Sequence, residues 1–305
     1  MIENAVSISV VICTYNRASY IQDAMESLVT QTLDKTAFEV IIVNNNSTDH
    51  TQQVCLDFLR AHPDYDFQYL NEPKQGASFA RNTGAALAKG QLLCFMDDDA
   101  VAGKDYLERI VYFFESHPDA GGLGGKIIPK YIPAEPAWMS YYVSSMVGNF
   151  DYSDTVEVFS PNKYPLESNM IIRKADFDAI SGFNTALPGV VGTLRIGGEG
   201  KDFFMRLKAL GRVIYYDPAI VVQHVVEVSK LTPEYLYRVA SGMGRGEKVR
   251  MKEIGSLAYY KKIAEYLFKL GAAVILGCKY FLQGYPKKFW PIIQFRIDTL
   301  KGLIE

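Results

Sequence analysis

Three consecutive carboxylates, Asp97, Asp98 and Asp99, directly follow an apolar stretch at 92–96. Like charges at this spacing repel one another and raise each other's pKa, so the arrangement costs free energy unless something offsets it. A divalent cation, a nearby Lys or Arg, or water at a surface turn could each provide the offset. These three possibilities predict different proteins.

Of the three possibilities, a metal site is the one that would give the aspartates a catalytic role. Mg²⁺ and Mn²⁺ prefer oxygen ligands, and proteins commonly hold them with one or two carboxylates together with phosphate oxygens of a substrate. In an extended turn alternate side chains point to the same side, so Asp97 and Asp99 could share one cation while Asp98 points elsewhere. The alternative is that the aspartates cap a helix beginning near Lys104, or are simply solvated.

The first hundred residues alternate between the patterns of strands and helices. Alternation with short links is typical of a parallel sheet with helices on both faces. Ser19 and Gln22 have the spacing of a capping box, and Gly90 is placed to end a helix. Apolar runs predict strands at 7–13, 38–43, 67–70 and 91–96, and the segments between them predict helices at 19–29, 47–62 and 76–90.

Polar segments follow each of these predicted strands. In parallel α/β sheets ligands bind at the carboxyl ends of the strands, so we expect these segments to converge on one crevice. The segments are Thr14–Arg17, Asn44–Asp49, Asn71–Gly76 and Asp97–Ala100.

The second half of the chain is less regular. Thr232 and Pro233 are suited to be the N-cap and first residue of a helix. Residues 130–165 mix prolines and aromatic side chains without periodicity, which indicates an inserted binding region. Strands are expected at 122–129, 168–174, 212–216 and 219–226, and a helix at 201–211.

The bulk composition is that of an ordinary globular protein of 305 residues with a net charge of −2, which gives no reason to expect nucleic acid as a partner. The four cysteines form no CxxC pair, so reduced thiols in a cytoplasmic protein are expected. The N-terminal apolar run has no preceding Lys or Arg and predicts a strand, not a signal peptide. The late apolar run Leu270–Cys278 is too short to span a bilayer.

A set of segments within about the first hundred residues carries a family resemblance: VVICTYNR, IQDAMESLVTQT, FEVIIVNNNSTDHT and GASFARNTGAALAKGQLLCFMDDD. Together, and in this order, they resemble the nucleotide-sugar half of family 2 glycosyltransferases, which have the GT-A fold. SNMIIRK, GGEGKDFFMRL and VVQHVV resemble the acceptor half, so the likeness extends to about residue 250. The resemblance implies an α/β fold with a GT-A-type mixed sheet, mainly parallel and flanked by helices, followed by a C-terminal helical appendage.

The resemblance also implies which residues bind the nucleotide-sugar donor. Tyr15 would lie against the base, and Asn44 would stand where the family usually has an acidic residue that contacts the base edge. An amide can bond a uracil edge as donor and acceptor, so we favour a UDP-sugar. Arg81 would meet the diphosphate or ribose, with a helix-surface ion pair as its alternative. The implied donor-site residues are Thr14, Tyr15, Asn16, Arg17, Asn44, Asn46, Gly76, Arg81, Asp97 and Asp98.

As cofactor, the resemblance implies Mg²⁺ or Mn²⁺ bridging the diphosphate. Asp99 would bind the metal, with Asp97 contacting the metal or the ribose. His224 follows a strand of valines and resembles a histidine that reaches the metal or phosphate in some relatives. A structural histidine at a strand end is the alternative.

Relatives that invert the anomeric centre use a carboxylate at the segment GGEGKD as general base, commonly in a Glu-Asp pair. This chain has Glu199 followed by Gly200, so the position expected to hold the base is a glycine. Glu199, in a glycine loop with no packing reason to be acidic, is the predicted base. Asp202 could act instead, or could be a first-turn helix residue favoured by the helix dipole.

Further candidates have equally ordinary explanations. Arg245 stands among glycines and could close over a departing diphosphate or be a solvated loop residue. Trp138, Tyr141 and Tyr142 could stack on the sugar rings of an acceptor or belong to the core.

The C-terminal tail is basic, with nine Lys or Arg against four Asp or Glu from Lys252 onward. Its short apolar and aromatic runs interleave with lysines, which suits helices lying in a membrane interface with Trp290 as an anchor. A helical pair docked on the catalytic domain, or a dimer contact, is the alternative.

We therefore predict a catalytic domain at 1–250, divided into a nucleotide-sugar half at 1–100 and an acceptor half at 101–250, and a basic amphipathic tail at 251–305. The predicted function is metal-dependent, inverting transfer from a nucleotide-sugar to a saccharide or lipid-linked saccharide in polysaccharide synthesis. The predicted location is cytoplasmic, with contact at the inner face of the cell membrane as a further hypothesis.

Two other functions stay open. A nucleotidyltransferase would also need carboxylates and a metal after a strand, but it usually has a glycine-rich phosphate loop that CTYNRASY lacks. A non-catalytic relative that binds nucleotide-sugars or glycans is the second, because of Gly200. A dinucleotide oxidoreductase is disfavoured, since G-x-G-x-x-G is missing where it would be needed.

Overall fold

The computed structural model describes residues 6–305 and divides the chain into two compact units. The first unit comprises 1–128, 150–185 and 200–224, and the second comprises 129–149, 186–199 and 225–305. Each unit is described by itself below. The boundary predicted at residue 250 stays a prediction.

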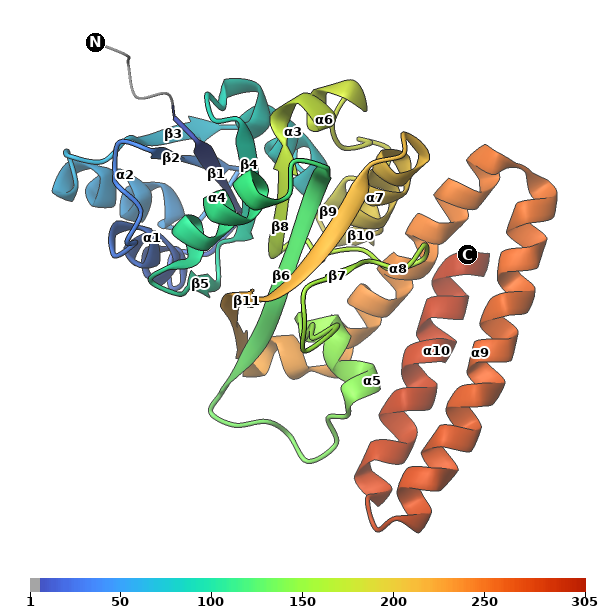
Figure 1. Cartoon of the computed structure of the whole chain (residues 1–305). Coiled ribbons are helices and arrows are strands. Elements are labelled where there is room, and N and C mark those ends of the chain that lie inside the picture. The colour runs from blue at the N-terminus through green and yellow to red at the C-terminus, as the bar shows by residue number, and fades with distance from the viewer. Residues whose placement is uncertain (1–5) are drawn as a thin grey trace. The chain divides into compact units, whose positions relative to one another are not determined.

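The parallel half of the first unit's sheet forms because its strand sequences are apolar without interruption. Successive side chains of a strand point to opposite faces, so Ile12 joins one buried cluster while Val11 joins a second cluster on the other face. The strands pair in parallel in the order β3-β2-β1-β4, which confirms the expected parallel sheet (Figure 1). They are β1 Ile8–Thr14, β2 Phe38–Asn44, β3 Phe67–Asn71 and β4 Leu92–Asp97.

Helices cover both faces of this sheet with their apolar sides. The cluster that contains Ile12 takes side chains from α1 Ile21–Val29, α2 Thr51–Ala61 and α4 Tyr106–Ser116. The cluster that contains Val11 takes side chains from α3 Ala77–Leu87, α6 Lys174–Ala179 and α7 Glu199–Ala209.

Two helix-end signals expected from the sequence, at Ser19 and at Gly90, are wrong. The N-cap of α1 is Tyr20 and carries no side-chain cap bond, so the capping box expected at Ser19 does not form. The third helix ends at Leu87, and Gly90 instead packs against β1, where its N–H donates to Ser9 Oγ at 2.8 Å. A Cβ at Gly90 would lie 2.6 Å from the Ser9 nitrogen, so close packing requires this glycine.

Beyond β4 the sheet continues in the order β8-β6-β11-β5, and β7 also pairs with β11. The pairs β4–β8, β8–β6, β11–β5 and β11–β7 are antiparallel. The two strands expected at 212–216 and 219–226 are one 15-residue strand. The strand runs through Pro218, and the Asp217 carboxylate accepts the Ala219 N–H at 2.8 Å. The strands are β5 Ala100–Ala102, β6 Ala120–Ile132, β7 Glu157–Val158, β8 Asn169–Arg173 and β11 Val213–Glu227.

The second unit is mainly helical, with one small antiparallel sheet of β9 and β10. Thr232 caps α8 as predicted, with its hydroxyl accepting the Tyr235 N–H at 3.2 Å. The elements are α5 Tyr141–Ser144, η1 Ser145–Val147, β9 Gly189–Val191, β10 Leu194–Ile196, η2 Val228–Leu231, α8 Pro233–Ile254, α9 Ser256–Leu282, η3 Pro286–Lys288 and α10 Phe289–Ile304.

The glycines of α8 serve close packing and do not form a flexible loop. A Cβ at Gly244 would lie 2.0 Å from the Thr299 carbonyl oxygen of α10, and one at Gly246 would lie 1.7 Å from the Gly197 carbonyl oxygen. The loop expected around Arg245 is therefore wrong, because the helix continues through it. The Arg245 guanidinium pairs with the Glu305 carboxylate at 3.0 Å.

Candidate functional site

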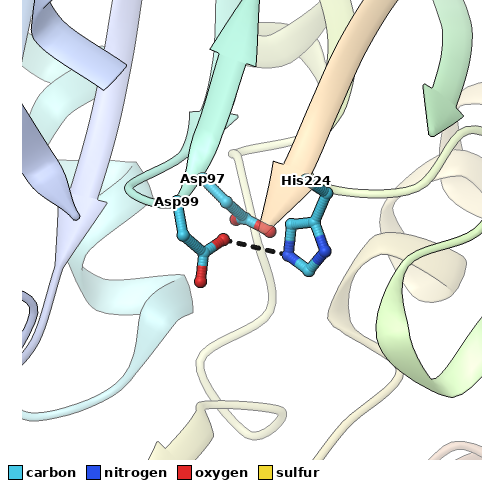
Figure 2. Close-up of side chains that lie close together, drawn as sticks. All are labelled: Asp97, Asp99 and His224. Carbon is cyan, nitrogen blue, oxygen red and sulfur yellow. Dashed lines mark ion pairs between the residues drawn. The ribbon is translucent and has the colours of Figure 1, made fainter. Parts of the chain in front are cut away.

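The three aspartates lie at the carboxyl end of β4, where that strand gives way to β5. Strand β11 runs antiparallel to β5 with His224 opposite Ala100, and this register brings the imidazole to the carboxylates. The His224 Nε2 atom lies 2.9 Å from Asp99 Oδ1, and one ligand atom each from Asp97, Asp99 and His224 lie within 4.8 Å of one another (Figure 2). The structure thus brings together the three residues predicted as metal ligands.

The negative charge at this site exceeds the positive charge around it. Asp98 and Asp99 are only 7% and 5% exposed. Arg17 is a cation beside them, and its Nε lies 3.6 Å from Asp98 Oδ1 and 3.8 Å from Asp99 Oδ2. Burial, and then the Asp99 charge, raise the pKa of Asp98 to about 7 against the opposing effect of Arg17 and a hydrogen bond from Thr14.

A divalent cation fits this set of side chains. Carboxylate oxygens are the ligands that Mg²⁺ and Mn²⁺ prefer, and the imidazole adds a nitrogen ligand. A cation would also offset the buried carboxylate charge that raises the pKa of Asp98. The excess negative charge and the ligand geometry therefore both indicate a site for a divalent cation.

Asp97 is held from two sides by side chains of the first unit. Arg81 Nη2 of α3 lies 3.8 Å from Asp97 Oδ1, and the Arg81 guanidinium stacks over the Phe183 ring at 5.4 Å. Arg81 is itself 7% exposed, so the surface ion pair considered as its alternative is excluded. Ser168 Oγ donates a short hydrogen bond to Asp97 Oδ2.

The loops after β1 and β2 bind one another. Asn16 has a left-handed backbone with φ 54°, and its side-chain oxygen accepts the Thr48 N–H at 2.8 Å while its own N–H donates to Ser47 Oγ at 2.9 Å. The Arg17 N–H donates to Thr51 Oγ1 at 2.8 Å, which fixes the backbone that carries the guanidinium. Tyr15 lies in this loop and is half-buried.

The side-chain amide of Asn44 is used inside the protein. Its nitrogen donates to the Tyr69 hydroxyl at 2.8 Å, and its oxygen accepts the Ser47 N–H at 3.0 Å. Asn44 therefore shapes the loop in which Asn46 takes a left-handed φ of 70°.

Asn45 and Ser168 are site residues that sequence reasoning missed. Asn45 accepts the Gly76 N–H at 2.6 Å and donates to the Lys74 carbonyl oxygen at 2.8 Å, so it fixes the loop that contains the predicted Gly76. Its place in the run NNNSTD is visible, but of the three amides the resemblance assigns donor-site roles only to Asn44 and Asn46. Ser168 reaches Asp97 only because β8 pairs with β4, and that pairing joins segments 71 residues apart.

The two predicted base candidates differ in their surroundings. Asp202 Oδ2 accepts from Arg206 Nε at 2.8 Å, one turn further along α7. The same guanidinium donates to the carbonyl oxygens of Ile180 and Gly182, so Asp202 holds a guanidinium that ties α7 to the loop after α6. Glu199 is the first residue of α7 and is 4% exposed; it belongs to the second unit.

The aromatic candidates also belong to the second unit. Tyr141 and Tyr142 are 67% and 45% exposed, whereas Trp138 packs against the unit's buried cluster. The two tyrosines are thus open to a ligand, and Trp138 is partly buried against the core.

Comparison with known proteins identifies the family of the sequence. The family described as Glycosyl transferase family 2 matches residues 9–178. The glucosyl-dolichyl phosphate glucuronosyltransferase of Haloferax volcanii is 28% identical over 180 residues, which cover 58% of this chain and 56% of that protein. The succinoglycan biosynthesis protein ExoM of Rhizobium meliloti is 25% identical over 81% of this chain and 77% of its own length.

Solved structures share the fold. The mannosyltransferase PcManGT of Pyrobaculum calidifontis, in complex with GDP-Man and Mn²⁺, matches with a TM-score of 0.67 at 18% identity over 97% of this chain and 86% of its own. S. aureus TarS 1–349, in complex with UDP-GlcNAc, matches with a TM-score of 0.56 at 21% identity over 78% of this chain and 66% of its own. The predicted fold class, a mainly parallel mixed sheet with flanking helices and a C-terminal helical region, is confirmed.

Proposed function

Because this chain belongs to glycosyl transferase family 2, we propose that it transfers a sugar from a nucleotide-sugar to a saccharide acceptor and inverts the anomeric centre. The observation that carries this proposal is the cluster of Asp97, Asp99 and His224 at the carboxyl end of β4. Relatives named as glycosyltransferases support the reaction class. Asp97 and Asp99 would hold Mg²⁺ or Mn²⁺ with His224, and the ion would supply charge neutralisation for a diphosphate leaving group.

The donor proposed for this site is a UDP-sugar. Arg17 and Arg81 flank the aspartates and would bind phosphate oxygens. Thr14, Tyr15 and Asn16 would form the nucleoside pocket, with Asn44 and Asn46 on its rim and Gly76 at its edge. TarS binding UDP-GlcNAc supports UDP, whereas PcManGT binding GDP-Man keeps GDP as the competing choice. Since the Asn44 amide is bonded within the protein, base selection by its side chain would require those bonds to rearrange.

The general base would be a carboxylate beside the first turn of α7. The sequence offers Glu199 and Asp202 for this role. Of these two the sequence favours Glu199, and Asp202 binds Arg206. The base would take the proton of an acceptor hydroxyl as that oxygen attacks the anomeric carbon.

The acceptor proposed is a saccharide or lipid-linked saccharide of polysaccharide synthesis. The names of ExoM and of the glucosyl-dolichyl phosphate glucuronosyltransferase support this class. No helix within residues 6–305 has both the length and the apolar content needed to cross a bilayer.

We propose that α9 rests on an anionic lipid surface. Its exposed apolar residues recur at steps of about seven positions, or two helical turns, as at 260, 267, 274 and 281 and at 268, 275 and 282, so they form one stripe along the helix. Lysines interleave with the stripe, as at Lys261 and Lys279, and would meet lipid phosphates. The exposed residues are Leu257, Tyr260, Leu267, Phe268, Val274, Ile275, Phe281 and Leu282, with exposures of 41–85%.

Vesicle flotation tests the lipid contact. We expect binding to vesicles that contain phosphatidylglycerol, weaker binding to pure phosphatidylcholine, and loss of binding in Phe268→Asp/Ile275→Asp. The stripe is instead a protein interface if the protein binds neither type of vesicle and the wild type is a dimer that the same double variant converts into a monomer.

Release of nucleoside diphosphate from a panel of UDP- and GDP-sugars tests the reaction. With Mn²⁺ and water or a saccharide as acceptor, we expect turnover of at least one donor, and its loss with EDTA. Donor binding without turnover in every case would favour the non-catalytic relative, and pyrophosphate release from a nucleoside triphosphate and a sugar phosphate would identify a nucleotidyltransferase.

A further inference from the structure

A tight turn before β8 carries two polar side chains to the candidate site. The Asn169 N–H donates to the Leu166 carbonyl oxygen at 3.0 Å, which places Glu167 and Ser168 at the two central positions of the turn. Asn169 pairs with Met96 in the sheet, so the turn lies at the carboxyl end of β4. Ser168 binds Asp97, and Glu167 is its immediate neighbour in the chain.

The Glu167 carboxylate fills the space that a side chain at position 200 would need. Its Oε1 atom accepts the Gly200 N–H at 2.9 Å. A Cβ built on Gly200 would lie 2.3 Å from Glu167 Oε1 and 2.7 Å from Glu167 Cδ. An aspartate at 200 would therefore need the space that the Glu167 carboxylate now occupies.

The backbone does not require the glycine at 200. Gly200 is in the first turn of α7 and is absent from the residues with positive φ, so any L-residue could adopt its conformation. A glycine inside a helix costs about 0.5–1 kcal/mol relative to alanine. The requirement for glycine comes from the Glu167 side chain that occupies the place of its Cβ.

We infer that Glu167 is the general base of this chain, supplying from the turn before β8 the carboxylate that position 200 lacks. This inference rests on the proposed function. Glu167, Gly200 and Asp97 all belong to the first unit, so the base and the metal ligands share one compact unit. The N–H groups at the start of α7 stabilise a negative charge next to them.

The transfer step balances with this assignment. The proton of the acceptor hydroxyl passes to a Glu167 oxygen while the hydroxyl oxygen forms a bond with the anomeric carbon. The bond from that carbon to the diphosphate oxygen breaks on the opposite side, and its electron pair leaves with the nucleoside diphosphate. Attack opposite the leaving group inverts the anomeric centre.

Relocating the carboxylate tests the inference. Glu167→Gln is expected to lower kcat for donor turnover by about 10²–10⁴-fold, the usual contribution of a general base, and Glu167→Ala should do the same. Glu167→Ala/Gly200→Asp removes the obstructing side chain and puts a carboxylate in the same space, so it should recover at least about tenfold of the activity lost. Glu167→Ala/Gly200→Asn has the same shape without a base and should recover none. Glu115→Gln, an exposed substitution on α4, should keep the wild-type rate.

Binding of nucleoside diphosphate separates this inference from the proposed function. Each variant should retain the thermal stabilisation that UDP or GDP with Mn²⁺ gives the wild type, since Glu167 is assigned to the acceptor side. Wild-type turnover with an unchanged rate in Glu167→Gln overturns the base assignment alone, and a loss confined to Glu199→Gln transfers the role to Glu199. Absence of wild-type turnover with every donor would overturn the proposed function and this inference with it.

Discussion

Asn169 is the polar centre on which the turn with Glu167 and Ser168 depends. Its side-chain nitrogen donates to the carbonyl oxygens of Lys126 at 3.0 Å and Ile220 at 2.9 Å, and its oxygen accepts the Tyr106 hydroxyl at 2.8 Å. Asn169 is 0% exposed, so water cannot replace a lost partner. One side chain thus joins β8 to β6, β11 and α4.

Tyr106→Phe should destabilise the protein by about 1–3 kcal/mol. The substitution deletes one buried hydroxyl and leaves the Asn169 oxygen without its donor, and that range is the usual cost of an orphaned buried polar group. Asn169→Asp should cost more, since it removes the donor of two carbonyl oxygens and places an oxygen against both. The free energy of unfolding is measured by urea titration with far-ultraviolet circular dichroism, because both tryptophans, Trp138 and Trp290, belong to the second unit.

Tyr112→Phe is the matched control. Tyr112 lies on the same helix and is 69% exposed, so its loss of a hydroxyl should change stability by less than about 0.5 kcal/mol. The reasoning is refuted if Tyr106→Phe stays within that margin of the wild type, or if the two tyrosine variants lose the same stability.

Further stability predictions concern α8 and α9. Gly244→Ala should destabilise by about 1–3 kcal/mol because its Cβ would lie 2.0 Å from the Thr299 carbonyl oxygen, whereas Gly271→Ala, which meets no atom within 4 Å, should stabilise by about 0.5–1 kcal/mol. Urea unfolding checks both, and equal effects would contradict the packing. Burial alone would raise the pKa of Glu265, but hydrogen bonds from Lys262 and Lys269 lower it to about 2. Its ion pairs therefore stabilise the fold above pH 4.5, and this stabilisation is lost as the pH falls toward 2. Glu265→Gln should therefore be slightly less stable than the wild type at pH 7, and this difference should shrink toward pH 2; a difference that does not vary with pH would contradict it.

The parallel half of the fold was predictable because its strands carry the information locally. Continuous apolar runs such as Val10–Ile12 can be buried on two faces only inside a sheet covered by helices. The antiparallel half depends on pairings between distant segments, so the single strand β11 was mistaken for two at Pro218. The glycines around Arg245 resembled a loop, although contact between helices is their physical reason.

The candidate site was predictable where the residue types themselves indicate a function, as carboxylates and histidine indicate metal binding. Asp97, Asp99 and His224 were singled out as metal ligands, and the register of β5 with β11 brings them together. Glu167 and Ser168 could not be singled out, because an ordinary Glu-Ser pair gains its meaning only from the β4–β8 register. The sequence shows a glycine where the family resemblance places a carboxylate, but the side chain that fills the space at Gly200 lies 33 residues away in the sequence.

Calorimetric titration of UDP and GDP, with Mn²⁺ or with EDTA, tests the central claim most directly. We predict that a nucleoside diphosphate binds only with Mn²⁺, and that Asp99→Asn weakens this binding by more than about tenfold, which corresponds to about 1.4 kcal/mol. Glu115→Gln should bind like the wild type. If neither nucleotide binds, or if binding is equal in EDTA and in Asp99→Asn, the aspartates after β4 are not a metal–diphosphate site and the account of the reaction fails.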